Sequence, residues 1–95
     1  MANIVATITA GDSDLLEVRI AIGENWVARQ RDVASGDSVV GNGAAQPDYD
    51  WISWVVDGPA GASFEISCAA DGIVRWTTSR TIKIGKPFHA GERKI

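Results

Sequence analysis

The chain has 95 residues, of which 9 are Lys or Arg and 12 are Asp or Glu, so its formal net charge is −3 at pH 7. This length predicts one domain spanning residues 1–95, and the dispersed basic residues argue against the basic face that nucleic-acid binding requires. The single cysteine, Cys68, excludes an intrachain disulfide.

The first third of the chain predicts three strands separated by turns rich in Gly, Asp and Ser. Residues 3–9 carry many β-branched side chains, which favour a strand. Residues 16–22 alternate Leu, Val and Ile with Glu, Arg and Ala, as a half-buried strand does. Residues 26–33 alternate less cleanly and predict a strand whose Arg29 and Arg31 face solvent.

The middle of the chain predicts a short strand at residues 38–40 and a long loop at residues 41–50. Residues 51–56 carry large side chains at both parities, so this strand is expected to be covered on both faces. After a turn at residues 57–61, residues 63–68 alternate again and predict another strand.

The last third opens with Asp71-Gly72, a dipeptide typical of a two-residue hairpin turn. Residues 73–84 predict one long strand or two broken ones, and residues 86–95 are expected to form a flexible tail. A long edge strand at residues 73–84 would leave backbone groups open, so we expect self-association into a homo-oligomer.

The fold class follows from the spacing of these elements. No segment shows helical periodicity over three turns, and turns recur every eight to twelve residues, so we predict an all-β chain. The expected architecture is a single compact antiparallel β-sandwich of about seven to eight short strands. Its core is expected to contain Leu16, Val18, Ile20, Ile22, Phe64, Ile66 and Ile82.

Catalytic and metal-binding residue patterns are sparse. His89 is the one histidine, and its glycine-flanked segment predicts a surface position rather than a supported base. Cys68 lies on the same face of its predicted strand as Phe64, so we expect it to be buried like a small hydrophobic residue. The aspartate pairs at residues 12–14 and 48–50 offer oxygens to calcium but lack EF-hand spacing, so we expect them to close turns. We therefore predict that the protein is not an enzyme and that it binds no metal ion and no cofactor.

The segment at residues 47–51 is the strongest candidate for a ligand site. A sugar ring needs a flat apolar platform with oxygen acceptors around it, and a choline headgroup needs aromatic faces around a cation. The alternative is that Trp51 caps the core and the aspartates only close a turn; Trp54 and Trp76 are expected in the core. The candidate ligand-binding residues are Asp48, Tyr49, Asp50 and Trp51, with Asn42 or Trp26 nearby.

Glycine, tryptophan and proline also occur in a characteristic order along the chain. The motifs are Gly23-x-x-Trp26, Gly58-Pro59-Ala60-Gly61, and Pro87-Phe88 followed by Ala90-Gly91. This order resembles the aegerolysin and actinoporin-like group of small membrane-binding proteins. The resemblance implies a disulfide-free β-sandwich that recognises lipids or glycans at membrane surfaces. The aromatic stretch and the amphipathic N-terminal helix of the cytolysins are absent, so pore formation by this chain alone is not expected.

These patterns together predict a non-catalytic binding module, toxin-like or lectin-like, for a membrane lipid headgroup or a cell-surface glycan. Such a module would contact membranes peripherally and expose Tyr49 or Trp51 in a concave site. The alternatives are an assembly subunit of a symmetric oligomer, which would hide these rings, and an inhibitor or immunity protein presenting the loop at residues 41–50. Residues 1–9 show no signal peptide, so we expect cytoplasmic synthesis and any release by a non-classical route.

Overall fold

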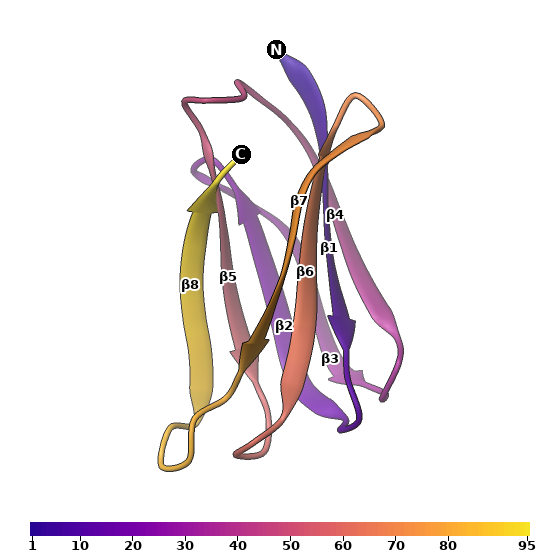
Figure 1. The fold of residues 1–95 in the computed structure, drawn as a ribbon, viewed down its shortest axis with the longest axis vertical. Coiled ribbons are helices and arrows are strands. Elements are labelled where there is room, and N and C mark those ends of the chain that lie inside the picture. Colours follow the sequence, from indigo (N-terminus) through magenta and orange to yellow (C-terminus); the bar gives the residue numbers. More distant parts are fainter.

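The computed structural model describes residues 1–95 and contains eight strands and no helix. The strands form two antiparallel sheets packed face to face, which confirms the predicted β-sandwich (Figure 1). The strands are β1 (Ala2–Ala10), β2 (Leu15–Ile22), β3 (Asn25–Val33), β4 (Ser38–Ala45), β5 (Trp51–Asp57), β6 (Ser63–Ala70), β7 (Ile73–Thr81) and β8 (Phe88–Lys94).

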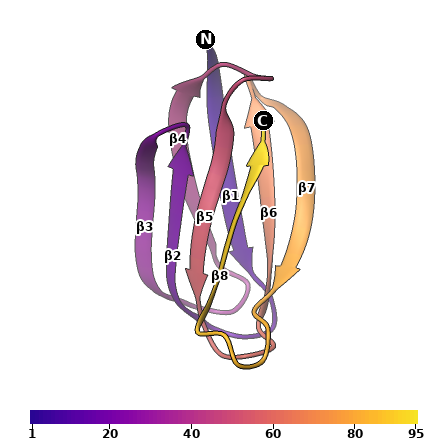
Figure 2. The same ribbon diagram turned by 90° about the vertical axis from the view of Figure 1, so that its left-hand side faces the viewer.

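Each sheet contains four strands. Sheet A has the order β4-β1-β6-β7, and sheet B has the order β3-β2-β5-β8. Strand β1 is central in sheet A, where it pairs with β4 on one side and β6 on the other. In Figure 2, the strands β2, β5 and β8 of sheet B lie in front of β1 and β6 of sheet A. The edge strands are therefore β4 and β7 in sheet A, and β3 and β8 in sheet B.

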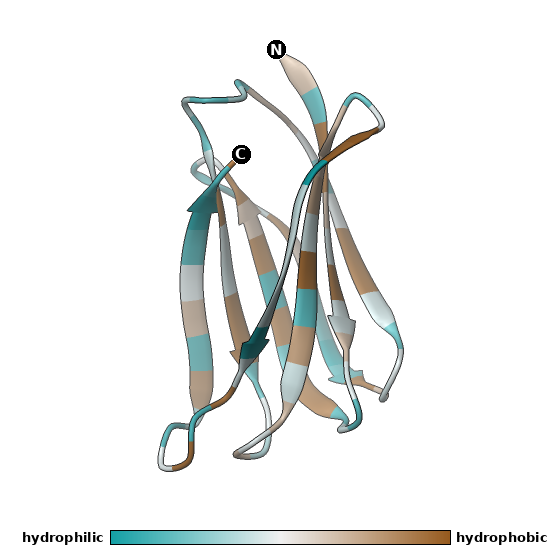
Figure 3. Cartoon of the chain, in the orientation of Figure 1, coloured by the Kyte–Doolittle hydropathy of each residue, from teal (hydrophilic) through white to brown (hydrophobic).

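The inward faces of the two sheets form one hydrophobic core of 22 buried residues. Strict alternation produces this core, and it is visible along β6 as hydrophobic and hydrophilic bands (Figure 3). Burying a large apolar side chain contributes about 1.5–3 kcal/mol, so the core is the main source of stability. The predicted core positions that are buried are Val18, Ile20, Ile22, Phe64, Ile66 and Ile82. Cys68 is also buried, and desolvation raises the pKa of its thiol.

Leu16 is the one predicted core residue that lies outside the core. Its side chain is 64% exposed, whereas the neighbouring Leu15 is 1% exposed. Leu15 lies opposite Val33, which is also buried. Asp32, just before Val33, has a left-handed backbone with φ of 55°, so the alternation of β3 breaks at this end. The prediction of Leu16 as a core residue was therefore wrong by one position.

The predicted loop at residues 41–50 is half strand. Residues 41–45 belong to β4 and pair with β1 in an unbroken register. Glycine occurs here because β4 packs closely against β3: a Cβ at Gly41 would lie 2.6 Å from Val27 Cγ2. The connection from β4 to β5 is only residues 46–50, so the long loop on which the inhibitor hypothesis depended is not present.

The predicted tail at residues 86–95 is mostly strand β8. This strand pairs with β5 along its whole length, and the backbone N–H of Ile95 donates to the carbonyl of Asp50 at 3.0 Å. Gly91 allows this pairing, because a Cβ there would lie 2.7 Å from Trp54 Cζ2. Instead of a flexible tail, the last residues complete sheet B, and Ile95 is buried.

The predicted hairpin at Asp71-Gly72 is confirmed. Both residues have positive φ, 49° and 82°, as the two central positions of a type I′ turn require. The turn joins β6 to β7, whose pairing contains a register shift between Cys68 and Ala69.

Candidate ligand-binding face

The two exposed tryptophans of the predicted site lie on the outer surface of sheet B. In β5, Ile52 and Trp54 point into the core, so Trp51 points away from it. The Trp51 side chain is 44% exposed and that of Trp26 on β3 is 60% exposed. We call the outer surface of sheet B around Trp26 and Trp51 the tryptophan face.

Strand β2 lies between the two tryptophans and brings them to the same end of the sheet. Ala21 of β2 is the ladder partner of Trp26, and the backbone N–H of Gly23 donates to the carbonyl of Trp51 at 2.9 Å. The side chain of Ala21 points outward, since Ile20 and Ile22 point inward, yet it is only 6% exposed. Larger neighbours therefore cover the sheet surface between the two rings.

Beside Trp26, three arginines surround one carboxylate; we call Arg19, Arg29 and Arg31 around Glu17 the arginine cluster. Glu17 Oε1 lies 3.3 Å from Arg19 Nε, and Glu17 Oε2 lies 3.0 Å from Arg29 Nη2 and 3.1 Å from Arg31 Nε. The hydrogen bond from Arg31 lowers the pKa of Glu17 most, and Arg29 and Arg19 lower it further. This carboxylate therefore stays ionised below its ordinary range.

The arginine cluster has donors that Glu17 does not use. Each guanidinium has five N–H groups, and the side chains of Arg29 and Arg31 are mostly exposed. Arg19 Nε is shielded from solvent but makes no well-aligned hydrogen bond, and the Arg19 guanidinium lies 5.8 Å from the centre of the Trp26 ring. Asp57, the ladder partner of Glu17 on β5, and Asp32, which follows Arg31 on β3, are further acidic groups near this cluster.

The two aspartates of the predicted site are engaged within the protein. Asp50 Oδ2 accepts the backbone N–H of Gln46 at 2.7 Å. Asp48 has φ of 74° and pairs through Oδ1 with Arg75 Nη2 of β7 at 3.1 Å. These contacts close the turn at residues 46–50 and connect it to sheet A. They are the turn-closing contacts that the alternative to a ligand site expected for the aspartates. The structure holds no group of three His, Cys, Asp or Glu side chains arranged for a metal ion.

The remaining predicted residues lie apart from each other. Asn42 is exposed on β4, where Val39 and Gly41 point inward, so it lies on the outer surface of sheet A and away from the tryptophan face. Tyr49 is 75% exposed in the turn before β5. The structure therefore brings together Trp26 and Trp51 and separates Asn42 from them.

Sequence reasoning missed the arginine cluster, because the cluster depends on a register shift between β2 and β3. The turn at residues 23–24 joins two alternating segments, and across this hairpin Glu17 lies opposite Arg31 and Arg19 lies opposite Arg29. Counting outward from this turn alone would pair Glu17 with Gln30 and Arg19 with Ala28, so the register shift after Ile20 is what brings the charged rows together.

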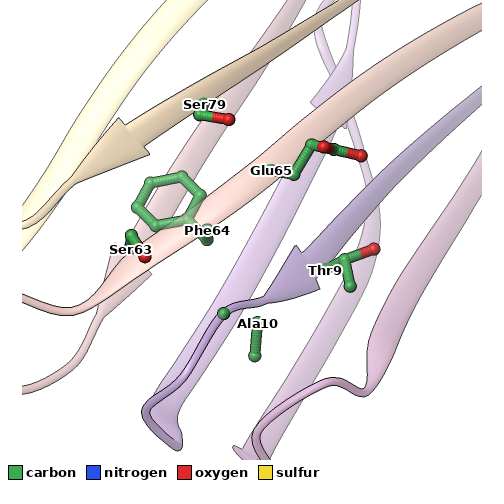
Figure 4. A pocket seen from close by; sticks show the side chains of 7 residues that line it. Thr9, Ala10, Ser63, Phe64, Glu65 and Ser79 are labelled. Carbon is green, nitrogen blue, oxygen red and sulfur yellow. The ribbon is translucent and has the colours of Figure 1, made fainter.

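The surface hollows lie elsewhere. One, of about 270 Å³, is lined by Thr9, Phe64, Glu65 and Ser79 among others, and the Phe64 ring lies near Ser63 and Ser79 (Figure 4). A second, of about 350 Å³, is lined by Lys83, Lys86 and residues 87–90. None of the hollows includes Trp26, Trp51 or Tyr49. The tryptophan face is therefore flat, in contrast to the concave site expected from the sequence.

His89 is held by packing rather than free at the surface. Its Nδ1 accepts a hydrogen bond from Trp54 Nε1 at 3.1 Å, and the two rings are nearly parallel, with an interplanar angle of 7°. The Phe64 ring meets the imidazole edge-on at 5.5 Å. Burial lowers the pKa of His89, and the positive charges of Arg80 and Lys83 lower it further. The histidine thus remains neutral in the pH range where a free one begins to ionise.

The structure contains no helical segment with the length and apolarity that a bilayer crossing requires. Comparison of the chain with protein-family models, with curated proteins and with solved structures found no match. The function is therefore inferred from the geometry of the tryptophan face and its surroundings.

Proposed function

We propose that the protein is a non-catalytic glycan-binding module whose ligand lies across the tryptophan face. The observation that carries this proposal is the exposure of Trp26 and Trp51 on one face and at one end of a rigid sheet. Large aromatic side chains gain from burial, so two exposed rings on a shared surface favour an interaction with a partner.

The chemistry of a sugar ring fits this surface. One side of a sugar ring presents C–H groups that stack on an indole, and its rim presents hydroxyls that need hydrogen-bond partners. The arginine cluster supplies N–H donors beside Trp26. Because guanidinium groups bind carboxylate and sulfate in a two-pronged manner, the preferred glycan carries uronate or sulfate groups.

A lipid headgroup remains the competing ligand. A choline group requires several aromatic faces around its cation, and the Trp26 ring already has the Arg19 guanidinium beside it. None of the hollows is lined by a tryptophan. A phosphate headgroup shares the anionic chemistry of an acidic glycan, so the experiment must separate the two sources.

The test is a screen of neutral, uronate-containing and sulfated oligosaccharides, run in parallel with phosphatidylcholine and phosphatidylserine vesicles. We expect acidic oligosaccharides to bind, and Trp26→Ala and Trp51→Ala each to weaken binding about tenfold, which corresponds to about 1.4 kcal/mol. Ile73→Ala, which removes an even more exposed apolar side chain from β7, is the control and should bind normally. Binding to vesicles alone, or equal losses in all three variants, would refute the proposal.

A further inference from the structure

The four edge strands of the sandwich differ in how they are protected. Edge strands in soluble proteins usually carry charges, proline or bulges that prevent pairing with another chain. Strand β4 carries no charged residue and no proline, and its pairing with β1 has no register shift. The charged residues of the other three edges are Arg29, Arg31 and Asp32 on β3, Arg75 and Arg80 on β7, and Glu92, Arg93 and Lys94 on β8.

The open backbone groups of β4 can be assigned from the ladder. The N–H of Ala10 donates to the carbonyl of Asp37, and hydrogen-bonded pairs alternate in an antiparallel ladder. The odd-numbered residues of β4 therefore bond to β1, and the even-numbered ones direct their N–H and carbonyl groups to the free edge. These outward residues are Ser38, Val40, Asn42 and Ala44, and none of them makes a backbone hydrogen bond outside the sheet.

We infer that two copies of this chain pair through β4, antiparallel and about a two-fold axis beside Gly41. In this register Val40 lies opposite Asn42 of the second copy, and Ser38 lies opposite Ala44. All four outward residues of each copy then bond, because each such pair exchanges two backbone hydrogen bonds. The two copies of sheet A become one continuous sheet (β4 is labelled at the margin of its sheet in Figure 1).

The charge distribution favours a second copy of the chain as the occupant. Two copies each carry a net charge of −3, so they approach most easily through an uncharged surface. Pairing of β4 with itself brings no like charges together, whereas two-fold pairing of β3 would bring the exposed Arg29 and Arg31 of both copies together. The side chains beside β4 on the outer surface of β1 are Val5, Thr7 and Thr9, which are also uncharged.

This inference moves the expected self-association from β7 to β4. Residues 73–81 do form an edge strand, but Arg75, Arg80 and the register shift in its pairing protect that edge. The inference is independent of the glycan proposal, because the tryptophan face belongs to the other sheet.

The test measures mass by sedimentation equilibrium over a range of protein concentrations. We expect the native chain to form a dimer, and Val40→Lys and Asn42→Lys each to raise the dissociation constant at least tenfold, because both place ammonium groups near the axis. Thr77→Lys, at an exposed position on β7 of the same sheet, is the matched control and should dimerise as the native chain does. Circular dichroism melting of all three variants confirms that they are folded.

Amide hydrogen exchange gives a second readout of the register. On dimerisation, exchange at the N–H groups of Val40 and Asn42 should slow at least tenfold, while exchange at Thr77 stays unchanged. A native chain that stays monomeric at millimolar concentration would overturn the inference, as would dissociation caused equally by Thr77→Lys. Slowed exchange only when an unrelated extended peptide is added would also overturn it, since the edge would then serve a foreign strand.

Discussion

The indole N–H of Trp54 donates to His89 Nδ1 across the β5–β8 pair, and the two rings lie 7° from parallel. This contact requires His89 to be unprotonated at Nδ1. It therefore links the packing of β8, the last strand of sheet B, to a group whose pKa is lowered by its burial in the fold.

The first prediction concerns pH and this contact. The pKa of His89 is lower in the folded protein than the ordinary 6.5, so below pH 6.5 the unfolded chain binds a proton that the folded chain does not. The free energy of unfolding should therefore be highest above this pH and fall as the pH drops below it, by at most about 1.4 kcal/mol per pH unit for one proton. Urea titrations at pH 7.5 and 5.5 measure the change.

The control for this prediction is His89→Gln, which does not titrate but offers an oxygen acceptor to Trp54 Nε1. Because His89 is the one histidine, the variant should show little change in stability between these two pH values. An equal loss in the native chain and the variant would show that another group is responsible.

The second prediction distinguishes the observed core from the one expected from sequence. Phe64 is 2% exposed, so Phe64→Ala should lower the free energy of unfolding by about 3–5 kcal/mol. Leu16→Ala should change it by less than about 0.5 kcal/mol, as at most surface positions. Chemical denaturation of both variants is the measurement, and a large loss for Leu16→Ala would contradict the exposed position of this side chain.

The third prediction concerns the close approach of β8 to the core. Gly91→Ala would place a methyl group 2.7 Å from Trp54 Cζ2, and the indole is packed in the core at 2% exposure. We expect a loss of about 1–3 kcal/mol in unfolding free energy. Gly43→Ala is the matched comparison, since the nearest atom to its Cβ would be 3.4 Å away, and it should be tolerated better. Similar losses for the two variants would argue against the steric explanation.

The fourth prediction concerns Glu17, whose carboxylate balances the arginine cluster. Glu17→Gln leaves three guanidinium groups facing each other, so the melting temperature should fall at low salt and recover partly as salt screens the repulsion. Because the pKa of Glu17 is lowered, its stabilising effect is present above pH 4.5 and lost as the pH falls below it. The difference in melting temperature between the native chain and the variant should therefore become smaller in acid. A difference that changes with neither salt nor pH would contradict this prediction.

Alternation of apolar and polar residues predicted most of this fold, because a strand with one buried face repeats every two residues. It succeeded for β1 and β6. It failed at β4, where Gly41 and Gly43 have the composition of a loop, although Gly41 serves close packing against β3. It failed again at β8, whose inward positions include Gly91 and the half-buried His89 rather than large aliphatic residues.

The candidate site was less predictable, because it depends on which strands are neighbours. Trp26 and Trp51 are far apart in sequence, and they share an end of one face because β2 lies between β3 and β5. Asp48 and Asp50 are close to Trp51 in sequence, but their bonds to Arg75 and Gln46 could not be predicted from local sequence patterns.

The central position of β1 also determines when the protein can fold during its synthesis. Its partners on the two sides are residues 38–45 and 64–70, so sheet A cannot form until the ribosome has released more than two thirds of the chain. Until then β1, an uncharged β-prone segment, can pair with β4 but lacks β6 on its other side, and such open segments aggregate readily. Closing these long loops is slow, whereas the β2–β3 hairpin is local and can form early. The nascent chain therefore has its greatest need of a chaperone before its sixth strand has emerged.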